Sequence, residues 1–176
     1  DINGDGFDDV LVGAHLRDST SALYPFDIGY SYVVFGKSSG FSPTMDLSSL
    51  DGSNGFRVTQ FRSDGSHVSS AGDMNGDGFD DVIVGAAFAD PNDSSFLNFA
   101  GPGASYVVFG KASGFSAAMD SSSLGGSNGF RLDGPPSIHK VSNAGDVNGD
   151  GIDDLIVGDL GADPNGSDSG SSYVVF

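Results

Sequence analysis

Cysteine and glutamate are both absent from this chain of 176 residues. Without cysteine there can be no disulfide bond and no thiolate metal site. All 24 acidic residues are aspartate, and they stand beside 28 glycines. Because aspartate and glycine are poor in helix interiors and good in turns, this composition predicts loops and short strands rather than helices.

Basic residues are also scarce, since seven Lys and Arg leave a net charge of −17. Nucleic-acid binding needs clustered Lys and Arg, so no nucleic-acid partner is expected. The sequence has no signal peptide and no apolar run long enough to cross a bilayer, so membrane insertion is not expected either. The chain begins inside a repeated motif and without an initiator methionine, so we expect it to be an excerpt of a longer protein.

A nine-residue acidic motif occurs three times, at 1–9, 73–81 and 146–154. Aspartate or asparagine stands at its positions 1, 3, 5 and 9, and glycine at positions 4 and 6 lets the backbone turn sharply enough for these oxygens to converge. With the backbone carbonyl of position 7, they form the oxygen cage that Ca²⁺ prefers. We therefore predict up to three Ca²⁺ ions, whose ligands are Asp1, Asn3, Asp5, Phe7 (carbonyl) and Asp9; Asp73, Asn75, Asp77, Phe79 (carbonyl) and Asp81; and Asp146, Asn148, Asp150, Ile152 (carbonyl) and Asp154.

The motif begins like an EF-hand loop but continues differently. An EF-hand needs a bidentate glutamate at its twelfth position and a helix on each side, whereas the twelfth positions here are Val12, Val84 and Val157. Each motif runs into a short β-branched segment that ends in glycine, which is typical of a buried strand. The loop is therefore expected to lead into a strand. A merely acidic Asx-type turn is the alternative, and threefold repetition disfavours it.

The repeat extends beyond the acidic motif, with offsets of 72 and 73 residues between successive copies. The segment 31–37 returns at 105–111 and begins again at 172–176. Each period holds four strand candidates, which in the second repeat lie around 67–72, 82–86 and 104–109 and over 119–132. Four antiparallel strands in a unit of this size are typical of a β-propeller blade.

The predicted fold is therefore all-β, with about two and a half propeller blades. We place a partial blade at 1–66, a complete blade at 67–138 and a second partial blade at 139–176, each with one calcium loop. By this count the chain has three strands of the first blade, four of the second and three of the last.

The segments between the second and third strands vary most in length, and all lie on one face of the predicted blades, at 17–30, 90–103 and 163–171. Loops that vary on a repeating scaffold are the natural place for binding, so we expect a protein or glycan ligand there. Glycosylation sequons fall in two of these loops, at Asn92 and Asn165.

The segments 71–78, 81–86 and 106–110 resemble the FG-GAP repeats of the integrin α-chain β-propeller and its bacterial relatives. The resemblance covers essentially the whole chain. It implies one blade per repeat, Ca²⁺ in the hairpin between the first two strands of a blade, and a role in adhesion or cell-surface recognition. Such propellers usually have about seven blades, and two and a half cannot close a ring. Either the chain is part of a longer array, or neighbouring blades or subunits cover its open strand edges.

Catalytic chemistry is not expected. The histidines His15, His67 and His139 are interpreted as structural, and no Gly-x-Ser-x-Gly elbow is present. The pair Asp80-Asp81 is interpreted as one ligand and one solvated neighbour. The Tyr and Phe of each Tyr-Val-Val-Phe segment are expected to pack in the core rather than to stack on carbohydrate.

The sequence thus favours a non-catalytic, calcium-stabilised binding or adhesion module. Open carboxylate sites fill at the millimolar calcium found outside cells, so an extracellular or cell-surface location is expected. One alternative is a subunit of an extracellular filament or surface layer. Another is an accessory domain of a secreted hydrolase.

Overall fold

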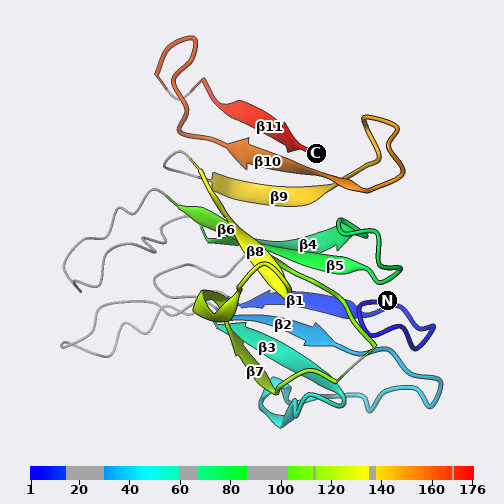
Figure 1. The fold of residues 1–176 in the computed structure, drawn as a ribbon. Coiled ribbons are helices and arrows are strands. Elements are labelled where there is room, and N and C mark those ends of the chain that lie inside the picture. Colours follow the sequence, from blue (N-terminus) through cyan, green and yellow to red (C-terminus); the bar gives the residue numbers. More distant parts are fainter. Residues whose placement is uncertain (15–29, 60–66, 87–102, 113, 135–137, 168) are drawn as a thin grey trace, which may run out of the picture.

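The computed structural model shows three β-sheets stacked face to face (Figure 1). It describes residues 1–14, 30–59, 67–86, 103–112, 114–134, 138–167 and 169–176. The only helical elements in these ranges are two three-residue 3₁₀ turns, η1 (Leu47–Ser49) and η2 (Ser121–Ser123). Within the described ranges no helix has the length and apolar character needed to cross a membrane.

Each sheet is built mainly from strands that follow one another in the chain. The first sheet contains β1 (Val10–Ala14), β2 (Tyr30–Val34), β3 (Gly55–Thr59) and β7 (Ala118–Asp120). The second contains β4 (His67–Gly72), β5 (Asp81–Ala86), β6 (Ala104–Val108) and β8 (Gly129–Asp133). The third contains β9 (Ile138–Gly145), β10 (Asp154–Asp159) and β11 (Ser171–Val175). The pairing is antiparallel between all neighbours except β3 and β7. This arrangement confirms an all-β fold of propeller blades, while the blade boundaries at 66 and 138 stay a prediction.

The prediction of a single outer strand over 119–132 was wrong in one respect. The structure divides this segment into two strands that belong to different sheets. Strand β8 completes the second sheet beside β6, whereas β7 crosses to the first sheet and pairs in parallel with β3. The first sheet therefore has four strands instead of the three expected, and the fourth comes from the next repeat.

The second sheet is buried on both faces, as the continuous apolar runs predict. On one face, Val82 and Val84 join the core of the first sheet around Phe56. On the other face, Ile83 packs against Leu155 of the third sheet. Alternation along β5 thus sends successive side chains into two different cores, because neighbouring residues of a strand point to opposite faces.

The segment before β7 ties the first two sheets together. Phe115 is only 7% exposed, and its ring stacks on that of Phe56 with a centroid distance of 4.4 Å and an interplanar angle of 5°. The backbone N–H of Arg57 donates to the carbonyl of Ala117 at 3.0 Å. We call residues 111–112 and 114–120 the crossing arm, because they leave the second sheet after β6 and pack on the first.

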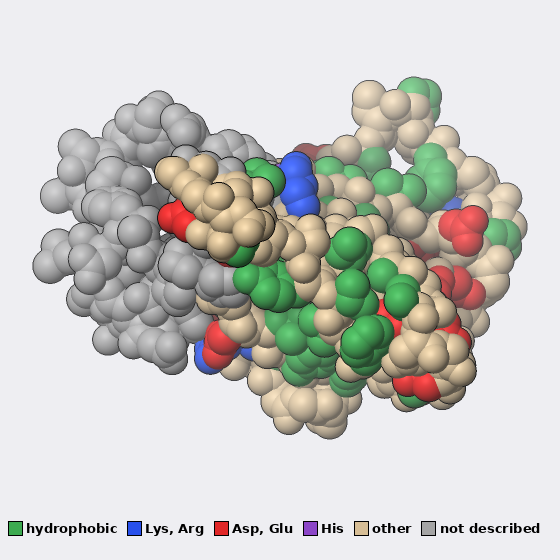
Figure 2. Space-filling model, turned by 90° about the horizontal axis from the view of Figure 1, so that it is seen from above, with side chains coloured by type: hydrophobic (Ala, Val, Ile, Leu, Met, Phe, Trp, Pro, Cys, Tyr) green, Lys and Arg blue, Asp and Glu red, His purple; other side chains and the backbone are tan. Residues whose placement is uncertain are grey.

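The face of the third sheet that points away from the second carries exposed apolar side chains. Ile156 is 39% exposed and Val174 is 42% exposed. Figure 2 views the molecule from this side and shows hydrophobic side chains gathered on it. The corresponding position of Ile156 in the second sheet is Ile83, which the third sheet covers completely.

Candidate metal-binding loops

The three acidic loops precede β1, β5 and β10, and all lie along the same side of the stack (Figure 1). Glycines at positions 4 and 6 have positive φ in every loop, as at Gly76 (φ 70°) and Gly78 (φ 90°). Only glycine adopts this conformation at little cost, so the two glycines account for the sharp turn. The sequence therefore folds locally into the compact loop that it predicts.

The side chains at positions 1, 3 and 5 turn back over their own loop. In the second loop, Asp73 accepts hydrogen bonds from the backbone N–H of Asp77 at 3.0 Å and of Gly78 at 2.9 Å. Asn75 accepts from the N–H of Asp77, and Asp77 accepts from the N–H of Phe79, both at 3.0 Å. The first and third loops repeat these four contacts. The three loops are thus copies of one structure.

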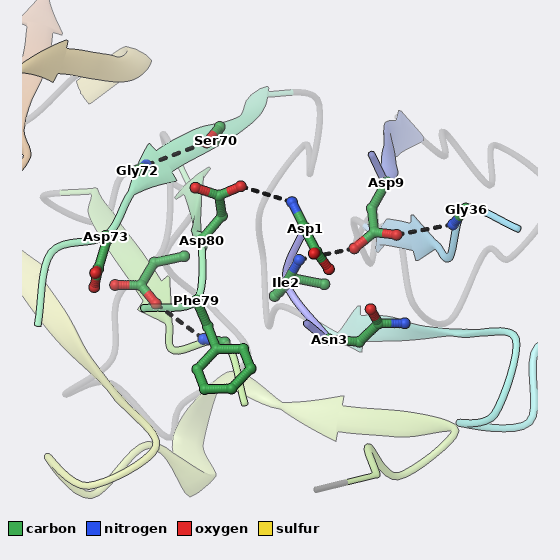
Figure 3. Close-up of polar contacts among 12 residues, drawn as sticks. Asp1, Ile2, Asn3, Asp9, Gly36, Ser70, Gly72, Asp73, Phe79 and Asp80 are labelled. Carbon is green, nitrogen blue, oxygen red and sulfur yellow. Dashed lines mark hydrogen bonds and ion pairs between the residues drawn. The ribbon is translucent and has the colours of Figure 1, made fainter. Parts of the chain in front are cut away.

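The aspartate at position 9 has a different environment. Asp81 is fully buried, and its two carboxylate oxygens accept from the N–H of Met74 at 3.0 Å and of Gly110 at 2.9 Å. Asp9 bonds Ile2 and Gly36 in the same way, both at 2.8 Å (Figure 3). In the first two loops the ninth residue therefore joins the start of its loop to the residue two positions after the end of the next paired strand, β2 or β6.

Burial also changes the acidity of this residue. Desolvation raises the pKa of Asp81 to about 6, although its hydrogen bonds from Gly110 and Met74 act in the opposite direction. The charges of Asp77 and Asp73 raise the pKa further. A cation beside Asp81 would favour the charged carboxylate and offset this cost.

The donor set of each loop fits a hard cation, because it consists only of carboxylate, amide and carbonyl oxygens. In the described part of the chain, however, no three histidine or acidic side chains stand in an arrangement that could hold a metal ion. The oxygens at positions 1, 3 and 5 face loop N–H groups, and the amide of Asn75 donates to Asp77 at 2.9 Å. The fifteen ligand assignments therefore stay a prediction.

The side chain of Asp80 is 51% exposed, as expected of a solvated neighbour, but the aspartate at position 8 has a further role that the sequence did not predict. Asp80 and Asp153 are not simply solvated neighbours of a ligand, because each contacts the loop of the preceding sheet. The Asp153 carboxylate accepts from the backbone N–H of Asp73 at 3.0 Å, and the Asp153 N–H donates to the Asp73 carbonyl at 3.4 Å. The Asp80 carboxylate accepts from the N-terminal ammonium of Asp1 at 2.6 Å (Figure 3), and the Asp80 N–H donates to the Asp1 carbonyl at 3.3 Å. The available signal was an aspartate at position 8 of all three motifs, where no ligand is needed.

The side chain at position 7 also reaches the preceding loop. The ring of Phe79 lies so close to Gly4 that any side chain at this glycine would collide with it. Ile152 lies near Gly76 but less closely, since its Cδ1 is 3.8 Å from a Cβ placed on the glycine, which is an ordinary van der Waals distance. Consecutive loops are therefore in direct contact through both position 7 and position 8.

The remaining candidate residues take no part in these loops. Nδ1 of His67 lies 3.3 Å from Nζ of Lys140, which is a contact between the second and third sheets. Asn165 is exposed, and its backbone N–H donates to Oγ of Ser169 at 3.2 Å. His15, the side chain of His139, Asn92 and most of the variable segments 17–30 and 90–103 lie outside the described residues. Glycosylation of either sequon stays a prediction.

Comparison with known proteins gives a consistent result. Residues 1–34 and 65–108 match the FG-GAP repeat family. Over 93% of its length the chain is 32% identical to integrin alpha-PS5 of Drosophila melanogaster and 31% identical to integrin alpha-V of Gallus gallus. Integrin alpha-5 of Xenopus laevis is 32% identical over the same share. The chain spans 14% of the length of each of these relatives. With three repeated acidic loops and three stacked sheets, the chain belongs to the FG-GAP repeat family and is similar to integrin alpha chains.

Proposed function

We propose that this chain is a calcium-stabilised, non-catalytic module of extracellular adhesion or recognition. The observation that carries the proposal is the threefold repetition of one oxygen-only loop with the same hydrogen bonds in every copy. The role of the ions is structural: each Ca²⁺ would bind the residues at positions 1, 3, 5, 7 and 9 of its loop and hold that loop rigid.

Charge repulsion between neighbouring loops supports this role. A hollow of about 250 Å³ lies between the first two sheets, and its walls include carboxylates of both loops, namely Asp1, Asp8, Asp9, Asp80 and Asp81. Like charges at such close range repel one another, and bound cations would offset the repulsion. The net charge of −17 makes this contribution larger than in a balanced protein.

The location and partners follow from the proposed calcium dependence and the family. Weak carboxylate sites fill at extracellular calcium concentrations, so the module would act outside the cell or at its surface. The integrin alpha similarity supports an adhesion role. The variable segments 17–30, 90–103 and 163–171 are where a protein or glycan ligand would bind.

Thermal melting with and without calcium tests the proposal. Ions that bind only the folded state stabilise it by about 2.7 kcal/mol per site at one hundred times the dissociation constant. For a chain of this size each kcal/mol raises the melting temperature by roughly 2–4 °C. We expect millimolar CaCl₂ to raise the melting temperature by about 5 °C or more over the protein in EDTA. An unchanged melting temperature would reject the calcium role.

A filament or surface-layer subunit is the second candidate, and one observation favours it. The outward face of the third sheet exposes Ile156 and Val174. The equivalent positions of the second sheet are buried against the third sheet. At the other end of the stack, Val10 is 51% exposed, whereas its equivalent Val82 is buried. Two open faces of this kind would allow copies to add end to end.

A further inference from the structure

We infer that the aspartate at position 8 couples neighbouring loops, so that a cation bound in one loop stabilises the loop of the preceding sheet. Asp153 links the third loop to the second, and Asp80 links the second to the first. The inference rests on the proposed function, since it requires the loops to bind calcium. It assigns a positioning role to residues that are not ligands themselves.

The contact holds the first ligand of the preceding loop at two points. Asp153 accepts from the N–H of Asp73 and donates its own N–H to the carbonyl of Asp73. Two hydrogen bonds to one residue restrict the peptide groups on both of its sides. The Asp73 carboxylate in turn accepts from Asp77 and Gly78, so the position of Asp73 determines how its loop is organised.

Asp153 is in turn fixed by its own loop. It directly precedes Asp154, which is buried and accepts from the N–H of Val147 at 2.8 Å. The Asp153 carboxylate also lies against Gly72, at a distance where any side chain on the glycine would collide with it. Gly72 adopts a φ of +67°, which a glycine tolerates best. Asp153 therefore has little freedom to move away from Asp73 once the third loop is ordered.

The two observed links have the same geometry, which argues against an incidental contact. Asp153 reaches the backbone N–H and the carbonyl oxygen of Asp73, and Asp80 reaches the same two positions of Asp1, where the nitrogen is the N-terminal ammonium. In both cases the position 7 side chain packs beside glycine 4 of the preceding loop. Ordering of one loop is thus transmitted through a polar and an apolar contact at once.

Hydrogen exchange of the whole chain, measured by mass spectrometry with and without calcium, tests the coupling. The peptide that covers residues 73–81 reports on the second loop alone. Asp150→Ala removes a proposed ligand from the third loop only. We expect Asp150→Ala to abolish the calcium-dependent protection of the 146–154 amides from hydrogen exchange. The same variant should reduce the calcium-dependent protection of the 73–81 amides by roughly five-fold or more, within the usual range of coupling between sites.

A second set of variants separates the hydrogen bond from charge. Asp153→Ala should itself reduce protection of 73–81, and adding Asp150→Ala to it should have no further effect there, as a double-mutant cycle requires. Asp153→Asn removes the charge but keeps an acceptor oxygen, so it should retain the coupling. Asp133→Ala is the control, because Asp133 lies in β8 and its carboxylate bonds Arg131 of the same strand, and it should leave 73–81 unchanged.

The outcomes distinguish this inference from the proposed function. If calcium protects none of the three loops in the unaltered chain, the calcium proposal fails and the coupling with it. If calcium protects all three loops but Asp150→Ala leaves 73–81 unaffected, the coupling alone is rejected. Equal losses in Asp153→Ala and Asp153→Asn would also reject it, since charge would then account for the effect.

Discussion

Within each acidic loop, the residue at position 9 differs from the other proposed ligands in burial. Asp81 is buried and bonded to the backbone of two separate segments, whereas Asp77 is exposed and bonded only within its loop. The two carboxylates should therefore contribute differently to the metal-free fold, although both are expected to bind the same ion.

The variants Asp81→Ala and Asp77→Ala test this difference in the presence of EDTA. Asp81→Ala leaves the N–H groups of Met74 and Gly110 without their acceptor, at a cost of roughly 1–3 kcal/mol for each buried group. Because burial penalises the charged Asp81 carboxylate, part of this cost is offset, and we expect a net loss of about 1–3 kcal/mol. Asp77→Ala should cost less than about 1 kcal/mol, as is usual for an exposed site. Urea denaturation measures both, and equal losses would contradict the distinction.

Asp159 is a buried residue that the repeat pattern does not explain. It occupies the position of Ala14 and Ala86 in the other sheets, is 1% exposed, and one of its carboxylate oxygens has no hydrogen-bond partner among the described residues. Its other oxygen accepts from the N–H of Gly161 at 3.1 Å. Burying a polar atom without a partner costs roughly 1–3 kcal/mol.

We therefore expect Asp159→Ala to stabilise the chain by about 1 kcal/mol, after subtraction of the lost bond to Gly161. This corresponds to a rise in melting temperature of roughly 2–4 °C. Differential scanning calorimetry in calcium measures the change. As a comparison, Ala86→Gly at the equivalent site should lower the melting temperature, because it removes a buried methyl group. A lower melting temperature of Asp159→Ala would show that the carboxylate has a stabilising partner.

At the scale of elements, the crossing arm exists in two copies with different surroundings. Phe115 is buried against the first sheet, while its equivalent Phe41 is 51% exposed. The two copies share a lysine placed over the phenylalanine ring. Lys111 lies 5.0 Å from the Phe115 ring centroid and Lys37 lies 5.1 Å from that of Phe41. The Lys–Phe contact is thus local, whereas burial of the phenylalanine and formation of β7 depend on a preceding sheet.

Phe115→Ala and Phe41→Ala are accordingly a matched pair. Removal of a core phenylalanine ring usually costs 3–5 kcal/mol, so we expect Phe115→Ala to lose about 3 kcal/mol of the free energy of unfolding. Phe41→Ala removes the same ring from an exposed site and should change this free energy by less than about 0.5 kcal/mol. Chemical denaturation of the two variants measures the difference. Similar losses in both would mean that the arm contributes locally and does not join the sheets.

The arm also shows which features the sequence could and could not predict. The strands around 67–72, 82–86 and 104–109 were predicted well, because short apolar or small-residue runs that end in glycine are local signals. The division of 119–132 into β7 and β8 was missed because β7 pairs with a strand about sixty residues earlier, and nothing within the segment specifies that partner. The link through position 8 was missed for the same reason, since Asp153 and Asp73 meet only when two sheets stack.

At the scale of the whole molecule, the stack has a buried middle and two open ends. Ile83 and Ile156 occupy equivalent positions in successive sheets, yet only Ile83 is covered by another sheet. Burial of apolar side chains between two stacked sheets holds the sheets together, because hydrophobic burial is the dominant favourable term in their association. The open face of the third sheet should therefore be the surface through which copies associate if they form a filament.

Ile156→Lys tests this prediction, with Ile83→Lys as the comparison. A lysine at the exposed Ile156 can extend its charge into water, so the variant should fold with nearly unchanged stability, whereas a lysine at the fully buried Ile83 should unfold the chain. Sedimentation velocity in calcium would then compare the unaltered chain with Ile156→Lys over a range of concentrations. Assembly of the unaltered chain that Ile156→Lys abolishes would support the filament. A monomer at every concentration would reject it and leave the adhesion module as the function of these repeats.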